Sequence, residues 1–181
     1  MGHEKMRMLE DVHILLVEDD ADTIDMYVFG LTRFGARVTA ATSVQQAFDL
    51  FRREPPDVLV SDISLDGGED GYELVRAVRA LGSDAGGDVP AVALTGWARG
   101  QDADRALAAG FTSHHRKPCM PDELAEILAL QVHAARQLRD RSAGQRIEQR
   151  QLRSELQERM RELRNQRDRL DAQWSRPTKN E

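Results

Sequence analysis

Acidic residues stand directly after two strongly apolar stretches of the sequence. Glu18 and Asp19 follow residues 14–17, and Asp62 follows residues 58–61. Carboxylates that share one site repel one another and raise one another's pKa values unless a cation neutralises them. An all-oxygen cluster suits Mg²⁺, which keeps several water ligands and accepts a phosphoryl oxygen as another. The acidic residues therefore predict a magnesium site that can receive a phosphoryl group.

Two further polar groups end segments that we expect to be short strands. Thr95 follows residues 91–94, and Lys117 follows residues 113–116. A lysine ammonium can neutralise one phosphoryl oxygen, and a threonine hydroxyl can donate a hydrogen bond to another. In an open α/β sheet the ligand crevice lies beyond the carboxyl ends of the strands. We therefore expect Thr95 and Lys117 to converge on Asp62.

The elements that position these residues alternate between strand and helix. Parallel strands need crossover connections, and those crossovers are right-handed, so this alternation predicts an α/β fold with helices on both faces of a parallel sheet. The expected strands are residues 13–17, 37–41, 57–62, 90–94 and 113–116, and the expected helices are 22–34, 43–53, 72–81, 102–109 and a last helix from 121.

Four short motifs at these strand ends resemble the receiver domain of bacterial two-component response regulators. They are Leu-Leu-Val-Glu-Asp-Asp at 15–20, Val-Ser-Asp at 60–62, Leu-Thr-Gly at 94–96 and Lys-Pro at 117–118. The resemblance covers about residues 12–130. It implies a flavodoxin-like, five-stranded parallel sheet of order 2-1-3-4-5 flanked by five helices, the last of which extends into a long C-terminal helix.

The resemblance also implies a function for the acidic site. Asp62 is expected to accept a phosphoryl group from a sensor histidine kinase or a histidine phosphotransfer protein. Glu18, Asp19, Asp62 and the backbone carbonyl of Ser64 would bind Mg²⁺. The protein would not be an enzyme for a separate substrate, but a phosphoryl acceptor that assists its own phosphotransfer and dephosphorylation.

Three further roles follow from the same resemblance. Lys117 would offset the charge of the phosphoryl group, and the family uses a cis peptide bond before Pro118 to aim this lysine. Thr95 would move toward the phosphoryl group as a switch residue. His114 occupies the position of the family's switch aromatic, three residues before the lysine; a histidine that simply fills a strand edge is an equally good interpretation.

The two parts of the chain differ in charge and pattern. Residues 1–130 hold 12 Lys and Arg against 23 Asp and Glu, which gives −11, whereas residues 131–181 hold 13 against 8, which gives +5. We expect a flexible leader at 1–11, a receiver domain at 12–130, a long helix or coiled coil at 131–176 and a disordered tail at 177–181. A seven-residue register from Leu128 places Leu156, Leu163 and Leu170 on one seam.

This organisation leaves more than one output open. The C-terminal helix is expected to signal by forming a homodimer or by binding another protein. Nucleic-acid binding by the basic helix is a less favoured alternative, because eight acidic residues lie among its bases. A docking scaffold that is never phosphorylated is another, although the intact acidic site argues against it. No segment has the 18 apolar residues of a membrane span, and we expect a cytoplasmic protein.

Overall fold

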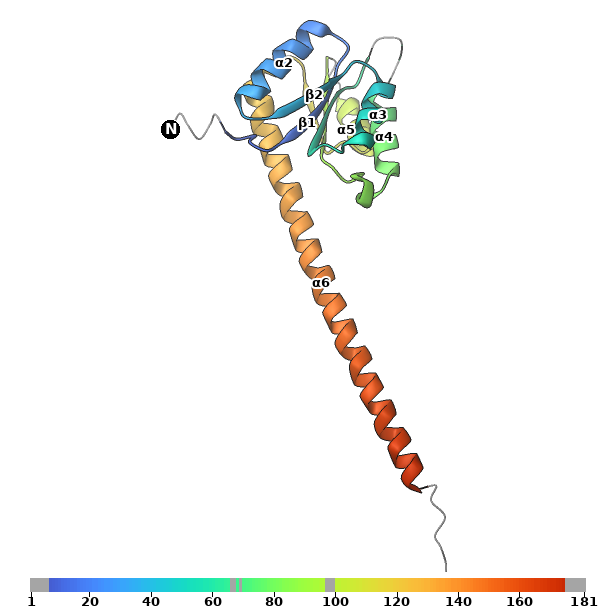
Figure 1. Ribbon diagram of the computed structural model, residues 1–181. Helices are drawn as coiled ribbons and strands as arrows, with labels where there is room; N and C mark the ends of the chain where they lie inside the picture. Colours follow the sequence, from blue (N-terminus) through green and yellow to red (C-terminus); the bar gives the residue numbers. More distant parts are fainter. Residues whose placement is uncertain (1–6, 66–67, 69, 97–99, 175–181) are drawn as a thin grey trace, which may run out of the picture. The chain divides into compact units, whose positions relative to one another are not determined.

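The computed structural model describes residues 7–65, 68, 70–96 and 100–174, without side-chain detail at 100–102 and at 145–150, 152, 153, 156 and 160–174. Strands and helices alternate as predicted (Figure 1). The strands are β1 (His13–Val17), β2 (Arg37–Ala41), β3 (Val58–Asp62), β4 (Ala91–Thr95) and β5 (Ser113–Arg116). The α-helices are α2 (Ala21–Arg33), α3 (Val44–Arg53), α4 (Gly71–Ala80), α5 (Gly100–Ala109) and α6 (Pro121–Trp174).

The five strands form one parallel sheet in the order β2-β1-β3-β4-β5, which confirms the predicted order. The register aligns the strand ends, since Val17 pairs with Ser61 and Thr95 pairs with Arg116. Because every strand runs in the same direction, the residues that follow them emerge at one edge of the sheet. We call this the carboxyl edge, and the opposite edge, where the strands begin, the amino edge.

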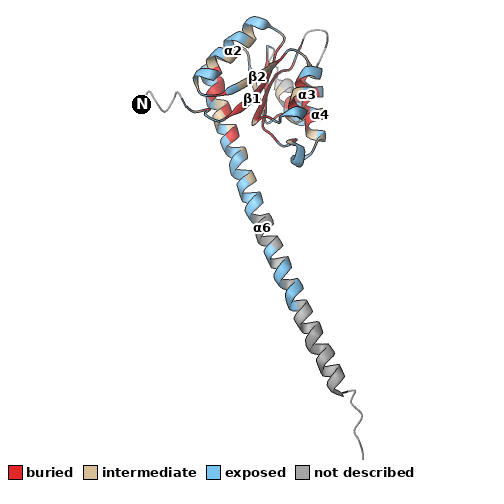
Figure 2. Cartoon of the chain, viewed as in Figure 1, coloured by how far each residue is buried: buried red, intermediate tan, exposed pale blue. Residues whose placement is uncertain are grey.

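Each face of the sheet carries its own apolar core. Figure 2 shows buried residues along the strands and at the start of α6. Alternate residues of a strand point to opposite faces, so a central strand that is covered on both faces is apolar along most of its length. In β1, Leu15 and Val17 pack with α3, α4 and α5, whereas Ile14 and Leu16 pack with α2 and the start of α6. Every residue of β1, β3 and β4 is buried. The three central strands therefore hold their terminal residues in fixed positions.

Polar side chains define where the helices begin. Asp20 caps α2 by accepting the Thr23 amide at 2.8 Å, and Ser43 caps α3 by accepting the Gln46 amide. Both caps satisfy amides that have no partner inside the helix. Asp20 and Ser43 thereby fix where α2 and α3 begin, and the residues just before them stay at the sheet edge.

The sequence predicts a flexible leader at residues 1–11, but residues 7–11 belong to the globular unit. Leu9 is fully buried in the core that α2 and α6 share, and its amide donates to the Phe34 carbonyl at 3.0 Å. Turns connect this segment to β1. A few apolar residues within a mostly charged run give no periodic signal, so the burial of Leu9 is decided by the tertiary fold.

The chain divides into two compact units, residues 1–136 and 137–181. Helix α6 begins in the first unit, where Leu124 and Leu128 are fully buried against the sheet. Leu128 is therefore not available to a helical partner, and the predicted seam cannot start there. The side chains of Leu156, Leu163 and Leu170 lie outside the described residues. Within the described part of the chain, no helix combines the length and the apolar character that a bilayer crossing needs.

Candidate functional site

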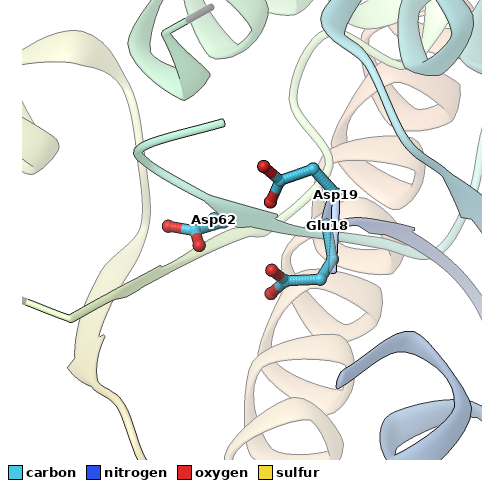
Figure 3. A group of neighbouring side chains, drawn as sticks. All are labelled: Glu18, Asp19 and Asp62. Carbon is cyan, nitrogen blue, oxygen red and sulfur yellow. The ribbon is translucent and has the colours of Figure 1, made fainter. Parts of the chain in front are cut away.

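The carboxyl edge brings three carboxylates together. Glu18 and Asp19 follow β1, and Asp62 is the last residue of the neighbouring strand β3. Their side chains point toward the same side of the sheet edge (Figure 3), with ligand atoms all within 4.8 Å of one another. Glu18 and Asp62 are buried and Asp19 is half-buried. The prediction that these residues converge is confirmed.

Lys117 completes the cluster from the other side. Its ammonium Nζ lies 2.5 Å from Asp62 Oδ2 and 2.5 Å from Glu18 Oε2. The lysine follows β5, and its backbone amide donates to the Thr95 carbonyl at 2.7 Å. The peptide bond to Pro118 is cis, as predicted. One ammonium is therefore shared between carboxylates that come from two different strands.

The site holds more negative than positive charge. Burial raises the pKa of Glu18, and hydrogen bonding to Lys117 only partly offsets that effect. Burial alone would lower the pKa of Lys117, but its hydrogen bonds to Asp62 and Glu18 outweigh burial and hold the pKa above its ordinary value. Both directions are those expected when three carboxylates surround one cation. The residues present fit Mg²⁺, because their donor atoms are all oxygens and one ammonium does not neutralise three carboxylates.

The loop after Asp62 is tied back onto that residue. The Ser64 amide donates to Asp62 Oδ1 at 3.0 Å, and Ser64 forms an isolated bridge with Asp70. Gly71 is required at the start of α4, because a Cβ there would lie 2.4 Å from the Asp62 carbonyl oxygen. The loop thus fixes one Asp62 oxygen while Lys117 contacts the other. The role of the Ser64 carbonyl as a metal ligand stays a prediction.

The two switch candidates lie on neighbouring strands. Thr95 is buried at the end of β4, where its carbonyl receives the Lys117 amide. His114 pairs with Ala93 in the middle of β5 and is half-buried. Its Nε2 is buried and has no hydrogen-bond partner among the described residues. The structure therefore brings Thr95 to the site, and the movement of either side chain stays a prediction.

Sequence reasoning missed two contacts near the site. The Tyr27 hydroxyl of α2 donates to the Cys119 carbonyl at 3.0 Å. The Arg105 guanidinium lies 4.4 Å from the centre of the Tyr72 ring and 3.7 Å from Asp70 Oδ2. Each contact joins residues far apart in the sequence, so no local pattern reveals it. A tyrosine on the inward face of α2 does predict some hydrogen-bond partner, because a buried hydroxyl needs one.

A parallel sheet of this order, with an acidic cluster and a lysine at its carboxyl edge, defines the class of response-regulator receiver domains. The family model for the response regulator receiver domain matches residues 14–129. The chain belongs to this family, which confirms the resemblance found in the sequence. Residues 130–181 lie beyond the matched region.

Two known proteins and one solved structure each resemble part of the chain. An uncharacterized 14.6 kDa protein in the sodA1 3' region of Leptolyngbya boryana is 42% identical over 68% of this chain and 92% of that protein. Regulatory protein VirG of Agrobacterium fabrum is 35% identical over 59% of this chain and 40% of VirG. The solved structure of chemotaxis protein CheY4 of Vibrio cholerae has a TM-score of 0.61 at 25% identity, over 66% of this chain and 98% of that chain. The chain spans less than half the length of VirG.

Proposed function

We propose that the protein is a two-component response regulator that accepts a phosphoryl group on Asp62 in a Mg²⁺-dependent reaction. A sensor histidine kinase or a histidine phosphotransfer protein would supply the group. The observation that carries this proposal is the shared ammonium of Lys117, 2.5 Å from both Asp62 and Glu18, beside a third carboxylate of Asp19. This arrangement leaves negative charge for a divalent cation and supplies a cation for the transferred group.

The reaction assigns a distinct task to each side chain. A carboxylate oxygen of Asp62 forms a bond to phosphorus, the bond from phosphorus to the donor imidazole nitrogen breaks, and the electron pair returns to the imidazole. Glu18, Asp19, Asp62 and the Ser64 carbonyl would hold Mg²⁺, which would supply positive charge to the phosphoryl oxygens when bound. Lys117 neutralises those oxygens from the opposite side, and the Thr95 hydroxyl donates to one of them.

In this proposal the protein acts on itself and has no separate substrate. The groups that stabilise charge during transfer to Asp62 also stabilise it when water later removes the phosphoryl group, because the same oxygens carry the charge. The protein would therefore assist both its own phosphorylation and its own dephosphorylation. Thr95 and His114 would report the modified state to the rest of the domain.

A small phosphodonor tests the proposal without a cognate kinase. The full chain is incubated with acetyl phosphate and Mg²⁺, and its intact mass is measured. We expect the mass of one phosphoryl group on the wild type and none on Asp62→Asn. Asp57→Asn is a matched control, because Asp57 precedes the same strand at the amino edge and should leave labelling intact. Absence of label on the wild type would leave only the scaffold interpretation.

The second unit is the proposed output element, acting as a homodimer contact or as a site for another protein. Two observations support this role: residues 137–181 form a separate compact unit, and Leu138 is exposed on α6. Sedimentation of the full chain, with and without acetyl phosphate, would be compared with a chain ending at residue 136. Identical monomers in every case would exclude the homodimer, and a pull-down would then test partner binding.

A further inference from the structure

Tyr27 connects helix α2 to the segment that carries Lys117. The residue is 1% exposed, and its hydroxyl donates to the Cys119 carbonyl at 3.0 Å, across 92 residues of sequence. Cys119 lies two residues after Lys117 and two residues before α6 begins. Both partners of this hydrogen bond are buried, so water cannot easily replace it. The bond therefore restrains the main chain close to the lysine.

A second contact joins the same helix to the same segment. Gly30 of α2 faces Pro121, and a Cβ at Gly30 would lie 2.3 Å from the Pro121 Cβ. Such close approach is possible only because glycine has no side chain. Helix α2 lies beside the start of α6 (Figure 1), and the two share one apolar core. Residues 119–121 are thus held against α2 at two points.

The lysine itself is restrained from the other direction. Its amide donates to the Thr95 carbonyl at the end of β4, at 2.7 Å. Its side chain is long and has several rotatable bonds, and its ammonium must reach two carboxylates at once. A small displacement of the main chain would lengthen both contacts. The position of the ammonium therefore depends on the anchors of the segment on each side.

We propose that Tyr27 is a positioning residue for Lys117, acting through its hydrogen bond to the Cys119 carbonyl. The inference rests on the proposed function of the acidic site. While Lys117 occupies Glu18 and Asp62, it competes with Mg²⁺ for the same oxygens. A loosened lysine would make Mg²⁺ binding tighter and phosphoryl transfer slower. General loss of structure would weaken both, so the opposite signs distinguish positioning from a merely structural role.

The test compares four full-length proteins: the wild type, Tyr27→Phe, Lys117→Ala and the double variant. Mg²⁺ affinity is measured by titration calorimetry on metal-free protein, and the phosphorylation rate is measured by intact mass with acetyl phosphate. We expect Tyr27→Phe to tighten Mg²⁺ binding by about fivefold, a factor typical of one hydrogen bond, and to slow labelling by a similar factor. In the Lys117→Ala background the same substitution should change Mg²⁺ affinity no further.

Two additional variants protect the conclusion. Thr39→Val removes a hydroxyl contact of the same length, 3.0 Å from His13 Nε2 at the amino edge, and should leave Mg²⁺ affinity unchanged. Gly30→Ala pushes Pro121 away from α2, so it should shift Mg²⁺ affinity in the same direction as Tyr27→Phe. It stands in if Tyr27→Phe does not fold.

The inference fails if Tyr27→Phe binds Mg²⁺ with wild-type affinity, or if it shifts affinity equally with and without Lys117. The proposed function fails separately. If the wild type takes no phosphoryl group, Asp62 is not the acceptor, but the Mg²⁺ titrations still decide whether Tyr27 positions Lys117.

Discussion

The two edges of the sheet carry similar residue types in different arrangements. At the carboxyl edge, buried Glu18 and Asp62 share the single ammonium of Lys117. At the amino edge, the ion pairs are balanced and more exposed. Arg37 pairs with Glu54 at 2.5 Å, and Arg136 pairs with Asp57 at 3.1 Å. Asp57 also accepts the His13 amide at 2.9 Å.

The difference separates the proposed phosphorylation site from a purely structural edge. Exposed, balanced pairs are screened by water and change stability little. Buried carboxylates in excess are costly unless a cation neutralises them, so the carboxyl edge fits a divalent cation and the balanced ion pairs of the amino edge do not. Burial disfavours the charged form at both ends of strand β1, since it raises the pKa of Glu18 after the last residue and lowers the pKa of His13 at the first, but only the carboxyl edge has an excess of carboxylates. Charge excess and burial together mark the functional edge.

Removing the cation at each edge should give the largest contrast. Lys117→Ala is expected to slow phosphorylation by acetyl phosphate about 100-fold, because the transferred oxygens lose a preorganised charge partner. Arg37→Ala removes a cation from an ion pair of the same length and should change the rate by less than about twofold. Intact mass against time measures both. Equal rates for wild type and Lys117→Ala would remove the lysine from the mechanism.

The second-largest effect should be on metal binding, which should depend on Asp19 but not on the neighbouring Asp20. Mg²⁺ at about 100 times its dissociation constant should raise the free energy of unfolding of the wild type by about 2.7 kcal/mol. Asp19→Asn is expected to weaken Mg²⁺ binding by more than about tenfold, since even outer ligands contribute that much. Asp20→Asn is the matched control, because asparagine also caps α2 and the net charge changes equally. Urea unfolding with and without Mg²⁺ measures the effect.

His13, at the amino edge, should make the stability of the protein depend on pH. Burial lowers the pKa of His13, with Arg37 acting in the same direction and Glu54 and Asp57 opposing it. The unfolded chain therefore binds a proton more readily, so the stabilising contribution is present above about pH 6.5 and is lost as pH falls through the folded pKa.

The test is urea unfolding of the wild type and His13→Gln between pH 8 and pH 5, values that bracket the ordinary histidine pKa of about 6.5. The difference in the free energy of unfolding between the two proteins should shrink or reverse as the pH falls. A constant difference would show that His13 does not titrate in this range. Thr39, which lies 3.0 Å from His13 Nε2, stays unchanged in both proteins.

Local rules were enough to place the site residues at one edge. Apolar strands end where Glu18 and Asp62 begin, and a parallel sheet must bring such ends together. The cis peptide before Pro118 followed from the family resemblance and is present. These features depend on strand direction and on short motifs, and both can be predicted from a single sequence.

Long-range packing could not be predicted in the same way. A seven-residue register predicts an apolar helix face but does not show whether a sheet or a second helix packs against it. In this fold the sheet packs against Leu128. Leu9 and Tyr27 each depend on a carbonyl far along the chain, from Phe34 and Cys119. No periodic pattern in the sequence predicts which carbonyl will accept the hydrogen bond. Such contacts emerge only when the whole domain is assembled.

The smallest expected effect belongs to Arg136 at the amino edge. Its guanidinium contacts Asp57 Oδ1 at 3.1 Å and the Asp11 carbonyl at 3.0 Å, which ties α6 to the start of β1 and β3. Arg136→Ala should lower the free energy of unfolding by at most about 1 kcal/mol, because the side chain is 46% exposed and solvent screens the pair. Urea unfolding should show a smaller loss at about 1 M salt. A changed phosphorylation rate in this variant would mean that the amino edge communicates with Asp62, and the contrast between the two edges would no longer hold.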